Sequence, residues 1–175
     1  FKSLLFIGAG AILHAARTRE MSRLGGLWRR MPWTAALFAF GSAAICALPP
    51  LNGFVSEWLV YMGLFHSVQV GGAAGWAVVP AIILLAMSGA LALAAFIKAG
   101  AVTFLGTPRS ALVAHAHECG WLMRGPMAAL ALGCLVLGVL PALCWPVLSR
   151  AVACWSADWT PVSAPVRDLG RAQLG

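Results

Sequence analysis

Residues 48–57 read Leu48-Pro49-Pro50-Leu51-Asn52-Gly53-Phe54-Val55-Ser56-Glu57, and they interrupt an apolar segment that would otherwise continue as one membrane-spanning helix. Two consecutive prolines remove two backbone N–H donors and cannot continue a regular helix, whereas Asn52-Gly53 can cap and restart one. The sequence therefore predicts a discontinuous transmembrane helix, broken at Pro49, Pro50, Asn52 and Gly53. Because irregular backbone in lipid must be covered by protein or reached by water, Glu57 beside the break is a candidate functional residue.

The composition around the break is that of a membrane protein. Of the 175 residues, 61% are hydrophobic and 10% are charged, and the mean hydropathy is +0.87. These values are too apolar for a soluble domain of this size. Because a helical pattern is already under way at Phe1, we expect the chain to be an internal or C-terminal piece of a longer protein.

Four apolar segments predict an all-α integral membrane protein with about four transmembrane helices. The expected helices span about residues 1–16, 32–65 with the break, 76–105 and 126–148, and together they make up one membrane domain over 1–148. Pro141 and Pro146 are positions at which the last helix can kink. Residues 149–175 contain tryptophans, prolines and mixed charges, and they predict an interfacial or disordered tail.

The distribution of arginines predicts the sidedness of the loops. Residues 17–31 contain five arginines and one glutamate, and residues 106–125 contain Arg109 and Arg124. Cytoplasmic loops are enriched in basic residues, so we expect both loops to be cytoplasmic and the formal net charge of +7 to reflect topology and not nucleic-acid binding. Residues 66–75 contain no fixed charge, and we expect them, with the tail, on the periplasmic side.

Ionisable residues within the apolar segments are the candidate site. These residues are Lys2, Glu57 and Lys98, with His14 as a weaker candidate. A charge at the centre of a bilayer costs about 2.5 to 3.5 kcal/mol on the insertion scale, so each needs a partner, water or a function. The alternatives are a structural ion pair or helix cap for Glu57, an interface just upstream for Lys2, snorkelling for Lys98 and an interfacial position for His14.

Other chemistry is not favoured by the sequence. Metal-capable side chains gather only in one polar loop, at His115, His117, Glu118 and Cys119, with no second cluster, and the five cysteines form no CxxC pair. We therefore expect no metal, no cofactor and no catalytic centre in this chain. The tryptophans are typical of packing and of membrane-interface belts.

Several stretches, in their order along the chain, resemble a known family. They are Phe1-Lys2-Ser3-Leu4-Leu5-Phe6-Ile7-Gly8-Ala9-Gly10, Leu24-Gly25-Gly26-Leu27, Arg30-Met31-Pro32-Trp33-Thr34 and the interrupted stretch at residues 48–57. They resemble the antiporter-like proton-translocating membrane subunits of complex I, Mrp antiporters and membrane-bound hydrogenases. Within that family they are most similar to the branch found in hydrogenase-4 and formate hydrogenlyase. The similarity is dense over about residues 1–65 and fades after about Gly125.

The resemblance implies roles for particular residues. Lys2 matches the lysine of the family's central hydrophilic axis, and Glu57 matches the ionisable residue of the second discontinuous helix. Lys98 matches a basic position that is less uniform in type. The first half of the family's fold, with its own broken helix, lysine and glutamate, is absent from this sequence, so residues 1–148 resemble part of an antiporter-like proton-translocating domain.

The resemblance leads us to expect a proton-translocating membrane subunit of a respiratory complex in the bacterial inner membrane. Its expected partners are other membrane subunits, a peripheral redox arm, lipid, and protons or sodium ions, with redox chemistry located in other subunits and no nucleic acid. The alternatives are an Mrp-type sodium/proton antiporter subunit, a NADH:quinone oxidoreductase membrane subunit, and a structural anchor whose charges form buried ion pairs.

Overall fold

The computed structural model describes residues 1–70, 75–110, 113 and 115–155. Within these ranges every regular element is a helix and no strand occurs, which confirms the predicted all-α class. The α-helices are α1 (Lys2–Ala16), α2 (Pro32–Ile45), α3 (Asn52–Val70), α4 (Gly75–Phe104), α6 (Trp121–Val139) and α7 (Trp145–Trp155). Three short 3-10 helices, η1 (Met21–Arg23), η2 (Leu27–Arg29) and η3 (Pro141–Leu143), lie in the connections.

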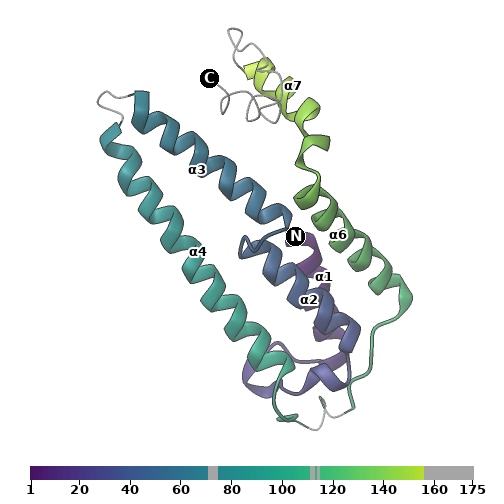
Figure 1. Ribbon diagram of the computed structural model, residues 1–175. Coiled ribbons are helices and arrows are strands. Elements are labelled where there is room, and N and C mark those ends of the chain that lie inside the picture. Colours follow the sequence, from purple (N-terminus) through teal and green to yellow (C-terminus); the bar gives the residue numbers. More distant parts are fainter. Residues whose placement is uncertain (71–74, 111–112, 114, 156–175) are drawn as a thin grey trace.

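The long helices form a bundle with an extended hairpin beside it (Figure 1). Helix α2 packs on α1, α4 and α6, and α3 packs on α4 and α6. Helices α3 and α4 run side by side in opposite directions, and the N-terminus lies near the junction of α2 and α3. The break between α2 and α3 is therefore near the middle of the assembly.

The best-buried part of the molecule lies where the loops that follow α1 and α4 pack against α1 and α2. Leu27, Met31 and Val113 are fully buried there, together with Ala11 and Ala16 of α1. The backbone N–H of Gly26 donates to the carbonyl oxygen of Leu105 at 2.9 Å. The loops that follow α1 and α4 thus pack against each other at one end of the bundle.

Within the described ranges, two helices are long and apolar enough to cross a membrane by length and composition, at Trp76–Phe104 and Trp121–Val139. Lys2–Ala16 and Pro32–Ile45 are apolar but shorter. Most of the large apolar side chains of α4 point outward, as expected for a helix that contacts lipid or further helices. The predicted total of about four spans stays a prediction.

Three predicted boundaries differ from the structure. Residues 66–70, expected in a loop, continue α3, because no glycine or proline ends the helix before Val70. The last apolar helix, expected at 126–148, begins at Trp121 and ends at Val139. Leu140 takes a non-helical conformation (φ −121°, ψ 62°) because the residue before a proline avoids the helical region.

The predicted tail is partly described. Its first residues, 149–155, belong to α7, so they are helical. The remainder of the predicted tail, 156–175, lies outside the described residues, as do residues 71–74 of the predicted loop after α3.

Candidate functional site

The break between α2 and α3 occupies residues 46–51. Helix α2 ends at Ile45, Ala47 adopts a left-handed conformation with φ 54°, and the Pro49–Pro50 peptide bond is cis. Pro49 and Pro50 lie within the break as predicted. Asn52 and Gly53, which were also predicted there, form the first turn of α3.

Glycines allow other helices to cover the break. A Cβ atom added at Gly53 would overlap the carbonyl oxygen of Ala44, and one added at Gly138 of α6 would overlap the carbonyl oxygen of Pro50. Leu51, between these contacts, is only 5% exposed. Protein therefore covers the irregular backbone at Leu51, whereas Leu48, Pro49 and Pro50 are exposed.

Asn52 does not cap α3 with its side chain. Its Oδ1 atom is buried and has no hydrogen-bond partner among the described residues. The first turn of α3 is instead closed by the N–H of Phe54, which donates to the carbonyl oxygen of Leu51 at 3.1 Å. Asn52 thus leaves a free acceptor next to the break.

Glu57 faces α4 at half its height. A Cβ atom built at Gly89 would lie 3.4 Å from Oε1 of Glu57, so the carboxylate rests against the backbone of α4. The Glu57 side chain is half-buried and has no ion pair or hydrogen bond among the described residues. At about 1.5 Å per residue, Gly89 lies about 21 Å from the first residue of α4 and about 22 Å from the last. The carboxylate is therefore level with the centre of the longest candidate span.

Two hollows open beside the Glu57 carboxylate. One, of about 440 Å³, also contacts Tyr61, and the other, of about 320 Å³, also contacts Ser56 and Ser88. The rest of their lining is mostly apolar. Among the described residues, Glu57 is the only Asp, Glu, Lys or Arg that lines either hollow.

Lys2 is level with Glu57 but is not in contact with it. Phe1 lines the smaller of the two hollows, so α1 begins at the height of Glu57. Lys2 is exposed and follows the helical spacing of Phe6, Ala9 and Leu13, which lie on another face of α1. Among the described residues no ion pair joins Lys2 to Glu57.

Lys98 and His14 lie farther away. Lys98 is exposed on α4, about 13 Å along the helix axis from Gly89 and on the opposite face, since nine residues at about 100° each give a half-turn. His14 is exposed in the last turn of α1, beside the arginine-rich loop. Of the four predicted ionisable residues, only Glu57 is half-buried in this structure.

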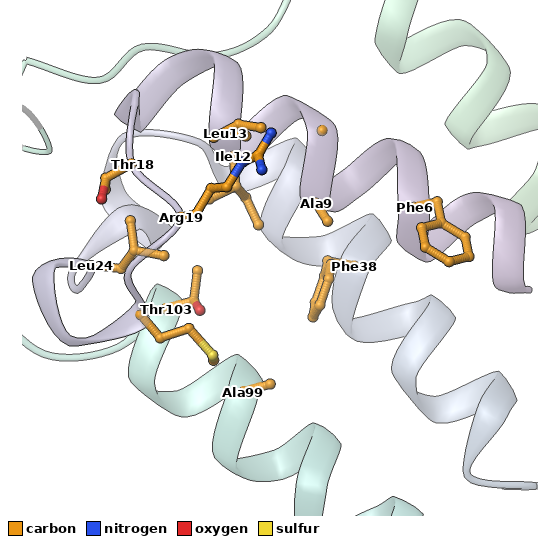
Figure 2. A pocket seen from close by; sticks show the side chains of 12 residues that line it. Phe6, Ala9, Ile12, Leu13, Thr18, Arg19, Leu24, Phe38, Ala99 and Thr103 are labelled. Atoms are coloured by element: carbon orange, nitrogen blue, oxygen red, sulfur yellow. The ribbon is translucent and has the colours of Figure 1, made fainter.

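A larger hollow, of about 730 Å³, lies between α1, α2 and α4. Figure 2 shows Phe6, Ala9 and Leu13 of α1 on one side and Ala99 and Thr103 of α4 on the other, with Phe38 of α2 between them. Arg19 lies at its loop end. None of Lys2, Glu57, Lys98 or His14 lines this hollow, so it offers no obvious site for proton exchange.

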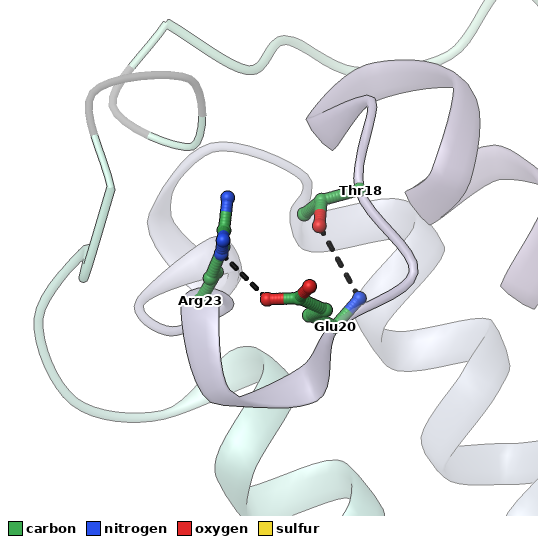
Figure 3. Close-up of polar contacts among 3 residues, drawn as sticks. All are labelled: Thr18, Glu20 and Arg23. Atoms are coloured by element: carbon green, nitrogen blue, oxygen red, sulfur yellow. Dashed lines mark hydrogen bonds and ion pairs between the residues drawn. The ribbon is translucent and has the colours of Figure 1, made fainter.

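The single acid of the first polar loop has a local partner. Glu20 Oε2 lies 2.6 Å from Nε of Arg23, and the backbone N–H of Glu20 donates to Thr18 Oγ1 at 3.2 Å (Figure 3). Both charged side chains are well exposed, so the pair contributes little to stability. The loop keeps its excess of positive charge.

Sequence reasoning missed a contact between the second polar loop and α2. Glu118 accepts hydrogen bonds from the backbone N–H of Trp33 at 2.9 Å and from the hydroxyl of Thr34 at 2.5 Å. Thr34 Oγ1 also lies 3.3 Å from Sγ of Cys119. Glu118, one of the metal-capable side chains of its loop, thus caps the first turn of α2.

One signal in the sequence could have indicated this cap. Helix α2 begins at Met31-Pro32-Trp33, without an acidic residue in its first turn and without a capping side chain at Met31. Its free N–H groups therefore require an acceptor from elsewhere in the chain.

Comparison with known proteins shows extensive similarity. A family model described as NADH:quinone oxidoreductase/Mrp antiporter, transmembrane, matches residues 1–84. The chain is 43% identical over 140 residues to hydrogenase-4 component B of Escherichia coli (strain K12), an alignment that covers 79% of this chain and 21% of that protein. It is 38% identical over 153 residues to formate hydrogenlyase subunit 3 of the same organism, an alignment that covers 87% of this chain and 25% of that protein.

A third relative has a different name. The chain is 36% identical over 162 residues to a probable K(+)/H(+) antiporter protein of Rhizobium meliloti (strain 1021), covering 92% of this chain and 16% of that protein. The chain thus spans between 16% and 25% of the length of these three relatives. The segment matched by the family model includes α1, α2, the break and all of α3, and with them Lys2 and Glu57.

Proposed function

We propose that this chain, whose residues 1–84 match the NADH:quinone oxidoreductase/Mrp antiporter transmembrane family model, is the proton-exchanging segment of a membrane subunit in a hydrogenase-4-like or formate-hydrogenlyase-like complex. The observation that supports this proposal best is the position of Glu57. Its half-buried carboxylate lies against Gly89 at half the height of α4, beside two hollows and near the helix break. A carboxylate in such a place can bind and release a proton.

In this proposal Lys2 relays a proton along the middle of the membrane and Glu57 exchanges it toward the outer side, while Lys98 tunes or extends the path. A lysine ammonium about 6 Å from a carboxylate favours the charged form by roughly 2.8 kcal/mol at an effective dielectric constant of about 20. Moving one charge through 100 mV costs about 2.3 kcal/mol. A change in the distance of one cation is therefore large enough to control proton binding at Glu57.

The names of the relatives support the proposed partners, and the distribution of arginines supports the proposed sidedness. We place the chain in the bacterial inner membrane, with residues 17–31 and 106–125 on the cytoplasmic side, in contact with other membrane subunits and a peripheral redox arm. Electron transfer occurs in those partners. The chain itself supplies the ionisable side chains and the water-accessible hollows.

Glu57→Gln in the intact complex, reconstituted into vesicles, tests the proposal. We expect redox-linked proton movement to fall by about tenfold or more, which corresponds to a barrier increase of about 1.4 kcal/mol, because the amide cannot bind and release the proton. The soluble redox reaction should remain measurable. Glu20→Gln, which alters an exposed loop acid, is the control and should pump normally. Unchanged proton movement in the Glu57 variant would refute the proposal.

A second candidate is a membrane protein of the cation/proton antiporters, of the sodium/proton Mrp type or similar. The observation that favours it is the 36% identity to the probable K(+)/H(+) antiporter protein. Sodium- or potassium-dependent proton exchange without any electron donor would distinguish it from the first candidate. The structural-anchor alternative needs buried ion pairs, and neither Lys2 nor Glu57 forms an ion pair among the described residues.

A further inference from the structure

Helices α3 and α4 touch where the side chain of Glu57 lies against Gly89. On α3, the larger hollow contacts Phe54, Trp58 and Tyr61, whereas the smaller one contacts Gly53, Ser56 and Val60. At about 100° per residue, the first three positions lie on one side of Glu57 and the second three on the other.

Helix α4 shows the same division around Gly89. Ala86, Ala90 and Leu93 line the larger hollow, and Leu85, Ser88 and Ala92 line the smaller one. By the same helical spacing these two sets lie on opposite sides of Gly89. The two hollows therefore lie on opposite faces of the α3–α4 pair, with the Glu57–Gly89 contact between them.

In the part of the chain that the structure describes, three residues line both hollows: Ala47, Glu57 and Gly89. Of these, Glu57 alone has a group that binds protons. Gly89 has no side chain, and the Glu57 carboxylate occupies the space where a longer side chain at position 89 would project. The carboxylate thus borders both hollows because position 89 is a glycine.

Both hollows contain polar groups that can bind water. Tyr61, which carries a hydroxyl group, lines the larger one. In the smaller one, Ser56 and Ser88 donate their own hydroxyl protons to the carbonyl oxygens of Gly53 and Leu85, each at 2.8 Å, so their oxygens remain free to accept from water.

We propose that Gly89 is a positioning residue that allows Glu57 to exchange protons with water on both faces of the α3–α4 pair. A hydronium ion in the water of one hollow gives its proton to a Glu57 oxygen and becomes neutral water. The resulting carboxylic acid gives that proton to a water molecule in the other hollow, which forms hydronium there and restores the carboxylate. The step transfers one proton and involves no oxidation or reduction. This inference rests on the proposed function of Glu57, and it adds the path that the proton takes and the residue that keeps the path open.

A series of substitutions at Gly89 tests the proposal in the full-length protein within its complex. The Cβ atom of Gly89→Ala would be in ordinary contact with Oε1, at 3.4 Å, so alanine should fold normally and lower proton movement by about twofold at most. Gly89→Leu should displace the carboxylate from one hollow and lower proton movement by about tenfold or more. Gly100→Leu is the matched control on α4, because a Cβ atom there meets nothing within 4 Å, and it should pump normally.

The outcomes separate this inference from the proposed function. Normal pumping by Gly89→Leu, with pumping lost in Glu57→Gln, would refute the role of Gly89 and leave the function of Glu57 intact. Normal pumping by Glu57→Gln would refute both the role of Gly89 and the proposed function of Glu57. The redox rate and the amount of assembled complex, measured in each variant, show whether a loss of pumping is specific.

A second experiment does not depend on a bulky residue at position 89. Single cysteines at Ala86 and Ser88, one in each hollow, are introduced into the protein with its native cysteines replaced, and each is modified with a small membrane-permeant thiosulfonate. Modification at either position should lower proton movement. The same modification of Ala94→Cys, an exposed position of α4 outside both hollows, should not. Inhibition from one hollow only, or from neither, would overturn the proposal.

Discussion

Two glutamates of this chain are both half-buried, but their surroundings differ. Glu118 accepts hydrogen bonds from Trp33 and Thr34 at the N-terminal end of α2. Glu57 has no such partner among the described residues and lies between two hollows. Glu118 thus has a structural role as the cap of α2, a role that Glu57 does not share.

Glu118→Ala should therefore destabilise the protein without a direct effect on proton transfer. Loss of a helix cap costs about 1 to 2 kcal/mol, and Glu118→Gln should cost less because it keeps an acceptor oxygen. Thermal unfolding of the purified full-length protein in detergent measures the difference. Glu20→Gln should change the stability by less than about 0.5 kcal/mol. Equal stabilities of the alanine and wild-type proteins would show that the cap is not energetically important.

The broken helix depends on close contacts with its neighbours. Its irregular backbone lies against α6 at Gly138, and Gly53 lets the first turn of α3 approach the end of α2 at Ala44. Backbone groups that leave a helix in a membrane must be covered in this way, because lipid offers them no hydrogen bonds.

Gly138→Ala should weaken the packing of α6 on the break. The added methyl group would overlap the Pro50 carbonyl, and overpacking of this kind costs about 1 to 3 kcal/mol. The yield of assembled complex and the unfolding temperature in detergent should both fall. Gly133→Ala, on the same helix, is the control, because a Cβ atom there meets nothing within 4 Å. If the two variants behaved alike, the contact between α6 and the break would not be limiting.

At the scale of the whole molecule, the two arginine-containing loops form one end of the bundle. The hydrogen bond from Gly26 to Leu105 joins them, and the far end of the α3–α4 hairpin lies at the opposite end (Figure 1). Whatever their side of the membrane, the two loops must therefore share it.

Labelling of single cysteines tests this arrangement in intact cells and inverted vesicles. In a background without native cysteines, Ser22→Cys and Thr107→Cys should react with a membrane-impermeant maleimide from the same side, which we expect to be cytoplasmic. Ser67→Cys, exposed near the end of α3, should react from the other side. Labelling of positions 22 and 107 from different sides would contradict the packing of the two loops.

The sequence by itself determined the helical class, the proline break and the positions of the ionisable residues, because these depend on local properties: hydrophobic length, missing N–H donors and side-chain charge. It did not determine which residues meet. The contact of Glu57 with Gly89, the cap that Glu118 provides to α2 from 85 residues away, the contact of Gly138 with the break and the separation of Lys2 from Glu57 all depend on tertiary packing. Helical periodicity shows which face a side chain occupies, but only the packing of helices distant in sequence decides what lies opposite that face.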